Sequence, residues 1–491
     1  MPEVLTLPET YPAPQKETAP GYHIMTWGCQ MNEEDSEQMS LYLEQSGYRA
    51  VESAEQAEVV LLNTCSVRAK PEDKVWSALG RLNDLKKIHP QLIIGVCGCM
   101  AQVESEAIKK RAPYVNMIIG TGNIAAIPEL LTRIKSGEQD IVALEPQSKQ
   151  NDGRKTIALT ALTLPPRKGA IVSDIPARKT ERTPKLKAHV PIMYGCDKFC
   201  TFCIVPFTRG RERSRPTAEV LTEIEALARN GTKEITLLGQ TVNSYGKNLP
   251  EGRVPFAQLL EQLNAIPGLR RIRFTSPYPR DFTDELIEAI GRLERVCEYV
   301  HLPLQVGDDA LLAEMHRGYT TAEYREIVRK LREQVPGIAL STDIMLGYPG
   351  ETDEQFWNTM RFVEEMRFDF AYMFAYSPRP NTKAAEREDQ LPQSLKLERL
   401  AQLIALQNGI TAEINQTLLG TVQEVLVEGY SQKDRNKLTG YTRTLRTVHF
   451  TIPQNGTRSP ESLIGKEVPV LLIESFLTGF IGTYAEPTPK A

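Results

Sequence analysis

The chain has 491 residues, a formal net charge of −4, 41% hydrophobic residues and 24% charged residues. At about 100–200 residues per domain, this length predicts two to four domains of an ordinary globular protein. The charge excludes a protein that coats nucleic acid by bulk attraction, so any such contact needs a local basic patch. No apolar run reaches the ~18 residues of a membrane helix, and the N-terminus lacks the pattern of a signal peptide. We therefore expect a cytoplasmic protein with a flexible extension over residues 1–20.

Residues 21–137 alternate between apolar runs and amphipathic segments, and therefore predict an α/β domain. The apolar runs predict strands at 22–27, 57–64, 91–96 and 115–120. The segments between and after them predict helices at 33–47, 70–88, 102–112 and 127–137. Continuous apolar runs of this kind indicate strands that are buried on both faces, which favours a doubly wound parallel sheet. Residues 138–185 lose the rhythm and hold scattered prolines, so we expect a linker or irregular wrap there.

The alternation returns over residues 186–413. Strands are predicted at 189–194, 234–239, 271–276, 299–304, 338–346 and 370–376, with helices between them and a long helix at 393–416. Six β/α units are too few for a complete eight-unit barrel of ~250 residues, so we expect a partial (β/α)6 barrel. The last segment, 414–485, switches to short strands and predicts a small β-barrel.

The stretch GCDKFCTFC places Cys196, Cys200 and Cys203 directly after the first predicted barrel strand. In a reducing compartment, clustered cysteines indicate a metal or redox site rather than disulfides. Thiolates suit iron–sulfur clusters or zinc. Three ligands instead of four would leave one iron of a 4Fe-4S cluster open to a small molecule, as catalytic metal sites keep an open position. The alternative is a zinc knuckle with one remote ligand.

Cys29, Cys65 and Cys99 are far apart in the sequence, but each lies just past the end of one of the first three strands. In an open parallel sheet, ligands bind outside the carboxyl ends of the strands. Three thiols could therefore converge at one edge and hold a second cluster with an open iron. The alternative is that they are buried core cysteines. We expect Cys97 to be a strand core residue and Cys297 to lie in the barrel core.

The pattern C-x3-C-x2-C on a partial β/α barrel resembles the radical S-adenosylmethionine (SAM) superfamily. The stretches GCQMNEEDSE, NTCSVRAKPEDKVW, GVCGCMAQ and GCDKFCTFCIVPFTRGRERSRP further resemble the methylthiotransferases within it. Among these, the chain is similar to the branch acting on isopentenyl-adenosine in tRNA. The sister branches usually show NTCGF, or GCKVN and GCRVN, where this chain has NTCSV and GCQMN. Two departures are HLPLQVGDD in place of QSGS, and the extra Cys97.

The resemblance implies two 4Fe-4S clusters, one on Cys196, Cys200 and Cys203 that binds SAM, and an auxiliary one on Cys29, Cys65 and Cys99. It also implies SAM contacts from Phe202 before the last cysteine, and we add candidates at the end of the second barrel strand: Gly239, Gln240 and Asn243. A glycine there would let the backbone approach the ligand closely. The alternative for that stretch is an ordinary turn with a packing glycine.

The implied reaction is the addition of a methylthio group to C2 of N6-isopentenyl-adenosine next to the anticodon of tRNA. The hydrogen on C2 is not acidic, so acid–base chemistry cannot replace it. In the superfamily, a radical formed by cleaving SAM reacts at such positions. The family picture needs both clusters to face one pocket between the first two domains. A one-electron reductant such as a flavodoxin or ferredoxin is implied, and we expect a monomer that contacts no membrane. The alternatives are the same chemistry on a ribosomal protein or on a threonylcarbamoyl-adenosine site, and a non-catalytic metal-dependent RNA-binding protein.

Basic residues in two places predict contacts with the anticodon loop. Arg209 and Arg211 follow the cluster loop and could hold phosphates. The terminal barrel resembles the TRAM domain, an RNA-binding module, and mixes basic with aromatic residues that suit an RNA loop; its candidates are Lys433, Arg435, Arg443 and Arg446. The alternatives are a solvated basic loop for the first group and a stabilising cap domain for the barrel.

Overall fold

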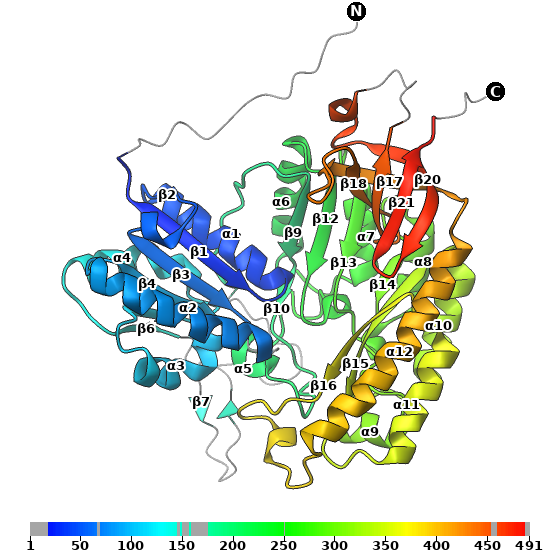
Figure 1. The fold of residues 1–491 in the computed structure, drawn as a ribbon, viewed down its shortest axis with the longest axis horizontal. Helices are drawn as coiled ribbons and strands as arrows, with labels where there is room; N and C mark the ends of the chain where they lie inside the picture. The colour runs from blue at the N-terminus through cyan, green and yellow to red at the C-terminus, as the bar shows by residue number, and fades with distance from the viewer. Residues whose placement is uncertain are drawn as a thin grey trace, which may run out of the picture. The chain divides into compact units, whose positions relative to one another are not determined.

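The computed structural model describes residues 18–65, 69–144, 148–149, 157–158, 175–249, 251–452 and 459–486. The chain divides into two compact units, 1–147 with Pro176–Lys179, and 148–175 with Thr180–Ala491. The first is the predicted sheet domain (Figure 1, blue to cyan), and the second holds both the partial barrel and the terminal β-barrel. The predicted extension over 1–20 lies outside the described residues up to position 17. Within the described residues, no helix is long and apolar enough to cross a membrane.

The first unit is a six-stranded, all-parallel sheet with strand order β2-β1-β3-β4-β5-β6. Its strands are β1 (Gly21–Trp27), β2 (Arg49–Ala50), β3 (Val59–Thr64), β4 (Ile93–Gly98), β5 (Met117–Ile119) and β6 (Ile141–Ala143). Its helices are α1 (Gln30–Gln45), α2 (Ala69–Ile88), α3 (Cys99–Arg111) and α4 (Ile127–Lys135). The sheet extends past residue 137, because the short apolar run of β6 adds an edge strand beside β5.

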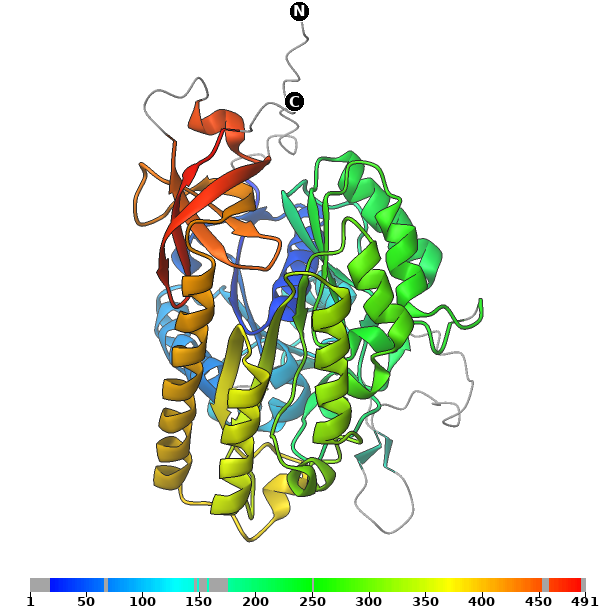
Figure 2. The same cartoon turned by 90° about the vertical axis from the view of Figure 1, so that its right-hand side faces the viewer.

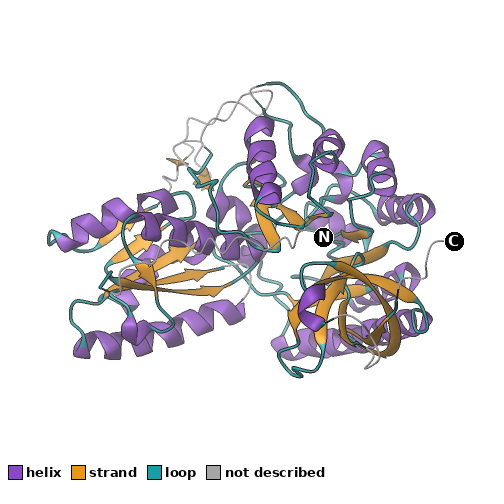
Figure 3. Ribbon diagram, turned by 90° about the horizontal axis from the view of Figure 1, so that it is seen from above, coloured by secondary structure: helices purple, strands orange, loops and turns teal. Residues whose placement is uncertain are grey.

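Helices cover both faces of this sheet, as Figure 3 shows. Val59 and Leu61 of β3 belong to the core that α1 and α4 cover. Val60 and Leu62 belong to the core beneath α2 and α3. Side chains of a strand alternate between its faces, so a strand covered on both sides must be apolar throughout. The predicted doubly wound α/β fold is confirmed.

The part of the expected linker that the structure describes returns to α1. The Arg178 guanidinium lies 2.9 Å from a Glu34 carboxylate oxygen, with both side chains almost fully buried. The Gln38 amide donates to the Lys179 carbonyl oxygen at 3.2 Å and accepts from its N–H at 2.7 Å. These residues therefore pack as part of the first unit. Much of 145–174 lies outside the described residues, apart from the short strands β7 (Ser148–Lys149) and β8 (Ile157–Ala158).

The second unit begins with six parallel strands, which form a partial barrel. They are β9 (Lys187–Pro191), β12 (Glu234–Leu238), β13 (Arg271–Phe274), β14 (Tyr299–His301), β15 (Ala339–Leu346) and β16 (Phe370–Ala375). They pair as β9-β12-β13 and β14-β15-β16, and a parallel bridge from Ile272 to Val296 links the two halves. The short strands β10 (Met193–Tyr194) and β11 (Arg213–Ser214) form an antiparallel pair.

Helices alternate with these strands along the chain. They are α5 (Val205–Arg209), α6 (Thr217–Arg229), α7 (Phe256–Asn264), α8 (Asp284–Arg292), α9 (Asp309–Glu314), α10 (Thr321–Gln334), α11 (Asp353–Met366) and α12 (Gln393–Thr417). Four of them begin behind a side-chain cap, which satisfies orphan N–H groups of the first turn; the caps are Thr283, Asp308, Thr320 and Thr352.

The strands alternate between an apolar face and a polar one. Ile235, Phe274 and Ile344 belong to the core under the helices. The residues between them point to the opposite face of the strands, which we call the inner face; among its residues are Glu234, Arg273, Tyr299, His301, Ser341 and Asp343. They bond to one another across strands, for example Tyr299 Oη with Ser341 Oγ at 2.6 Å. The inner face is thus lined by hydrogen-bonded polar groups.

The long helix α12 leads into a closed barrel (Figure 2, orange to red) with the order β17-β18-β19-β21-β20. Its strands are β17 (Val422–Tyr430), β18 (Leu438–Thr442), β19 (Thr447–Thr451), β20 (Glu467–Phe476) and β21 (Gly479–Tyr484). Their inward residues form a separate core that includes Val425, Phe450 and Phe480. The predicted partial barrel and small β-barrel are both confirmed.

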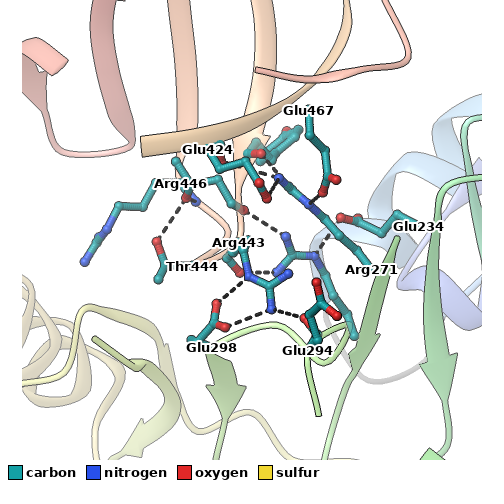
Figure 4. Close-up of polar contacts among 12 residues, drawn as sticks. Glu234, Arg271, Glu294, Glu298, Glu424, Arg443, Thr444, Arg446 and Glu467 are labelled. Atoms are coloured by element: carbon teal, nitrogen blue, oxygen red, sulfur yellow. Dashed lines mark hydrogen bonds and ion pairs between the residues drawn. The ribbon is translucent and has the colours of Figure 1, made fainter. Parts of the chain in front are cut away.

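Arginines join the terminal barrel to the partial barrel (Figure 4). Arg271 of β13 is fully buried, and its guanidinium contacts Glu467 at 2.7 Å and the Tyr441 carbonyl oxygen at 2.7 Å. Arg273 donates to the carbonyl oxygens of Arg443 and Thr442 at 2.6 and 2.8 Å. Because these bonds come from strand residues of the partial barrel, the two barrels are held as one unit.

Candidate iron–sulfur centres

The loop from Gly195 to Cys203 joins β10 to α5 and gathers three thiols. Gly195 has a φ of +73°, and a Cβ there would lie 2.1 Å from the Arg211 carbonyl oxygen, so only glycine fits. The Cys196 N–H donates to the Gly210 carbonyl oxygen at 3.1 Å. The Cys203 N–H donates to the Cys200 carbonyl oxygen at 3.0 Å. These backbone bonds fix the shape of the loop that carries the three cysteines.

The thiols of this loop are close enough to influence one another electrostatically. Burial raises the pKa of Cys196, and negative charge on Cys203 and Cys200 would raise it further. Burial and the neighbouring Cys200 likewise raise the pKa of Cys203. The raised pKa values keep Cys196 and Cys203 protonated unless a cation binds them, and iron is such a cation, since a coordinating thiol is deprotonated. The set fits an iron–sulfur cluster.

Polar groups surround this loop. Lys198 and Asp281 form an ion pair, and Asp281 also accepts from Ser244 Oγ at 2.5 Å and lies 3.1 Å from Lys247 Nζ. Burial opposes ionisation of Asp281, but Lys198 and the other partners hold its pKa below the usual value. Glu212 is buried, and its loss of solvation raises the pKa of its carboxyl to about 7. The cysteine motif does not predict this network, because the residues of the network come from segments that are far apart in the sequence.

The three SAM candidates after β12 differ in what they contact. Gly239 packs against Met193, since a Cβ would lie 2.6 Å from its Cγ. The Asn243 amide is engaged at both ends, because Nδ2 donates to the Tyr278 carbonyl oxygen at 3.0 Å and Oδ1 accepts from the Tyr278 N–H at 2.7 Å. Gln240 Oε1 is buried and lacks a protein partner among the described residues. Of the three, Gln240 has an acceptor that a ligand would satisfy. Phe202 is half-buried against the barrel core.

The second set of cysteines lies on three neighbouring strands. β1, β3 and β4 are adjacent and parallel, and Trp27 pairs with Thr64, which pairs with Gly98. Cys65 and Cys99 each directly follow an aligned strand end, and Cys29 comes two residues after its own. Cys65 and Cys99 are buried and Cys29 is exposed. The sheet register thus places the three residues at one edge of the sheet.

Buried asparagines support this edge. The Cys29 N–H donates to Asn32 Oδ1 at 3.3 Å, and Asn32 Nδ2 donates to Asn63 Oδ1 at 3.3 Å. Asn63 Nδ2 donates to the Asn32 carbonyl oxygen at 2.8 Å and to Ser36 Oγ at 2.9 Å. The network ties the start of α1 to the end of β3. Sequence reasoning missed both asparagines, although each lies within two or three positions of a candidate cysteine.

All eight cysteines lie in the described part of the chain, and none is in a disulfide there. Cys97 points into the core under α1 and α4, as expected, and Cys297 is also buried. Among the described residues, no three His, Cys, Asp or Glu side chains gather tightly enough for a single metal ion. A four-iron cluster takes each thiolate on a different iron, so its ligands stand further apart.

The arginines predicted to bind RNA are mostly engaged within the chain. Arg209 is buried, and Arg211 forms a two-pronged contact with Asp197 at 2.5 and 3.0 Å. Arg443 makes a two-pronged contact with Glu298 at 2.7 and 2.8 Å (Figure 4). Arg446 pairs with Asp369. The charges of Arg211, Arg443 and Arg446 are therefore used in holding loops and barrels together.

Lys433 and Arg435 differ from those arginines. Both are exposed, in the loop between β17 and β18.

The comparisons with known proteins agree with this geometry. Residues 21–120 match the model of the uncharacterized protein family UPF0004, and residues 190–363 match the radical SAM superfamily. A solved radical SAM methyltransferase, TsrM from Kitasatospora setae, aligns with a TM-score of 0.52 at 16% identity, covering 74% of this chain and 75% of that one. At that identity the likeness supports the fold. Fold and family models together define a radical SAM enzyme with an additional N-terminal α/β domain.

Curated relatives specify the family. The chain is 45% identical to tRNA-2-methylthio-N6-dimethylallyladenosine synthase of Thermoanaerobacter pseudethanolicus, covering 92% of this chain and 90% of the relative. It is 44% identical to the enzyme of that name from Moorella thermoacetica, covering 89% and 93%. For Alkaliphilus oremlandii the identity is 46%, covering 92% and 90%. The chain belongs to the family of tRNA-2-methylthio-N6-dimethylallyladenosine synthases, radical SAM methylthiotransferases that use SAM and 4Fe-4S clusters.

Proposed function

We propose that this chain adds a methylthio group to C2 of N6-isopentenyl-adenosine in tRNA, next to the anticodon, using SAM and two 4Fe-4S clusters. The observation that carries the proposal is the register of β1, β3 and β4, which brings Cys29, Cys65 and Cys99 to one edge in a chain that also has the cysteine loop. The relatives, similar over nearly their whole length, are named for this reaction. A sulfur-inserting reaction has a use for a second cluster, whereas a simple radical cleavage of SAM needs one.

In this proposal each set of cysteines holds its own cluster. Cys196, Cys200 and Cys203 hold the SAM-binding cluster, and Cys29, Cys65 and Cys99 hold the auxiliary one. Reduced iron–sulfur clusters supply the electron that cleaves SAM. Gln240 offers a buried acceptor to SAM, and half-buried Phe202 offers an apolar surface to its adenine. Gly239 and Asn243 shape the turn that presents Gln240, since they pack against Met193 and Tyr278.

The tRNA surface in this proposal includes the loop between β17 and β18. Lys433 and Arg435 are exposed there and can reach phosphates. RNA bases that are modified are usually unstacked from a loop and bound on their edges. The hydrogen-bonded inner face of the partial barrel offers donors and acceptors for such a base. We also propose a cytoplasmic monomer served by a flavodoxin- or ferredoxin-like reductant, since the chemistry needs single electrons at low potential.

The test is an anaerobic assay of the purified, cluster-loaded chain with SAM, dithionite and isopentenylated tRNA. Nucleoside mass spectrometry should show the replacement of one hydrogen by a methylthio group on isopentenyl-adenosine. Matched arms contain tRNA without the isopentenyl group, tRNA with threonylcarbamoyl-adenosine, and a ribosomal protein. Modification of one of these alone, with isopentenylated tRNA unchanged, would overturn the substrate assignment.

A further inference from the structure

Arg317 brings a buried guanidinium to the cysteine loop of the second unit. It lies between α9 and α10 and is almost completely buried. Its Nη1 donates to Cys200 Sγ at 3.4 Å. The same loop is tied to the cysteine loop through the backbone, because the Thr201 N–H donates to the Met315 carbonyl oxygen at 3.1 Å. The contact between guanidinium and thiol is therefore fixed by both side chain and main chain.

The rest of the guanidinium is held by neutral groups. Its Nε donates to Tyr319 Oη at 3.0 Å, and its Nη2 donates to the Pro303 carbonyl oxygen at 3.2 Å. The rings of Tyr278 and Tyr319 lie 5.1 and 5.3 Å from its central carbon. Nε and Nη2 are thus each hydrogen-bonded to a neutral oxygen, and Nη1 faces the cysteine sulfur. These contacts together hold the guanidinium in one orientation.

Several other buried arginines in the described part of this unit contact a carboxylate. Arg182 lies 3.1 Å from Glu223, and Arg399 lies 2.6 Å from Glu351. Arg317 has no carboxylate among its contacts in the described residues. Burying a charge without an opposite one is costly, and an arginine stays protonated in proteins. Its compensating negative charge must come from Cys200, as a thiolate bound to a cluster.

We propose that Arg317 is a positioning residue that sets the reduction potential of the cluster on Cys196, Cys200 and Cys203, by fixing a permanent positive charge against one ligand sulfur. The inference rests on the assignment of that cluster under the proposed function. Reduction adds one electron, and so one negative charge, to the cluster. A fixed positive charge in a buried site favours the reduced form, and hydrogen bonds to cluster sulfurs are among the factors that set such potentials. Arg317 thereby makes the electron that cleaves SAM easier to deliver.

The measurement is a redox titration of the full-length protein, followed by the electron paramagnetic resonance signal of the reduced cluster, with dithionite as reductant and no tRNA. A background with Cys29, Cys65 and Cys99 replaced by Ala leaves one cluster, so the signal is assigned directly. In R317M, the ratio of reduced to oxidised cluster at a fixed potential should fall at least tenfold, which is about 59 mV for one electron. In R317K, which keeps the positive charge but loses the several N–H groups of the guanidinium, this ratio should fall less.

Arg399→Met is the matched control, because it removes a buried arginine of the same unit that contacts a carboxylate. It should lower stability and leave the cluster potential unchanged. The proposal is overturned if R317M holds its iron and titrates at the wild-type potential. If R317M and R317Q both lose the cluster while R317K keeps it, the requirement for charge is supported. Loss from all three variants would assign Arg317 to packing alone. None of these outcomes depends on methylthiolation, so the proposed function is tested separately.

Discussion

The two cysteine sites of this protein are built in opposite ways. Cys196, Cys200 and Cys203 lie within eight residues, and the loop that holds them is fixed by its own backbone bonds and by Gly195. Cys29, Cys65 and Cys99 span 71 residues and lie at one edge of the sheet because three parallel strands end in register. The first site depends on local geometry, and the second on the correct assembly of a sheet. A set of three cysteines can thus be placed either by one short loop or by the assembly of strands from distant parts of the sequence.

The largest expected effect separates ligand cysteines from core cysteines. C203A and C65A should each abolish methylthiolation and lower the iron content from about eight to about four per chain. C97A, which alters a buried residue two positions from Cys99, should keep about eight irons and retain activity. Iron and sulfide analysis after anaerobic reconstitution measures this. Normal iron in C99A together with lost iron in C97A would reverse the assignment of these two neighbours.

The auxiliary site should also be sensitive to the strand ends beneath it. Gly98 has a φ of +89°, and a Cβ would lie 2.4 Å from Asn63 Oδ1 and 2.8 Å from the Thr64 carbonyl oxygen. G98A should lower the free energy of unfolding by at least about 1 kcal/mol from backbone strain alone. The clash of the added Cβ should also prevent the auxiliary cluster from binding, so the iron content should fall. G137A is the control, since Gly137 has a φ of +101° with open space around its Cβ position. Equal iron content in both variants would refute a role for the strand ends.

Glu212 gives the surroundings of the cysteine loop a pH dependence. Burial raises the pKa of its carboxyl from 4.5 to about 7, which corresponds to about 3 kcal/mol. Between these values the unfolded chain loses the proton and the folded chain keeps it, so stability falls as pH rises. E212Q should flatten that fall in denaturant titrations from pH 4.5 to 7.5. An identical slope in E212Q and wild type would contradict the prediction.

The smallest expected effect compares exposed with engaged basic residues of the terminal barrel. The double variant K433A/R435A should weaken tRNA binding and reduce the salt dependence of log K by about 0.7 for each phosphate that is no longer neutralised, with stability unchanged. R443A should instead lower the free energy of unfolding by about 2 kcal/mol, because Glu298 loses its charged partner. Binding measured across a salt series and thermal unfolding separate the two. A lower salt slope in R443A at unchanged stability would place Arg443 on the RNA surface.

The strand pattern and the cysteine spacing were predictable because both are local. An apolar run such as Val59–Leu62 needs no partner to be recognised as a strand buried on both faces, and the spacing of the cysteine loop is complete within its own segment. The placement of Cys29, Cys65 and Cys99 at one sheet edge was also predictable, since parallel strands end at one edge of a sheet. The asparagines behind that edge were not, because amide hydrogen bonds leave no periodic signal.

The arginines show where sequence reasoning stops. The sequence by itself determined that Arg209, Arg211, Arg443 and Arg446 carry charge, and it suggested a shared role with Lys433 and Arg435. Only the tertiary structure supplied Asp197, Glu298 and Asp369 as the neighbours of Arg211, Arg443 and Arg446. It also placed Arg317 against Cys200, 117 positions away. A charge is fixed by the residue type, whereas its partner and its solvation depend on which distant segments the fold brings beside it.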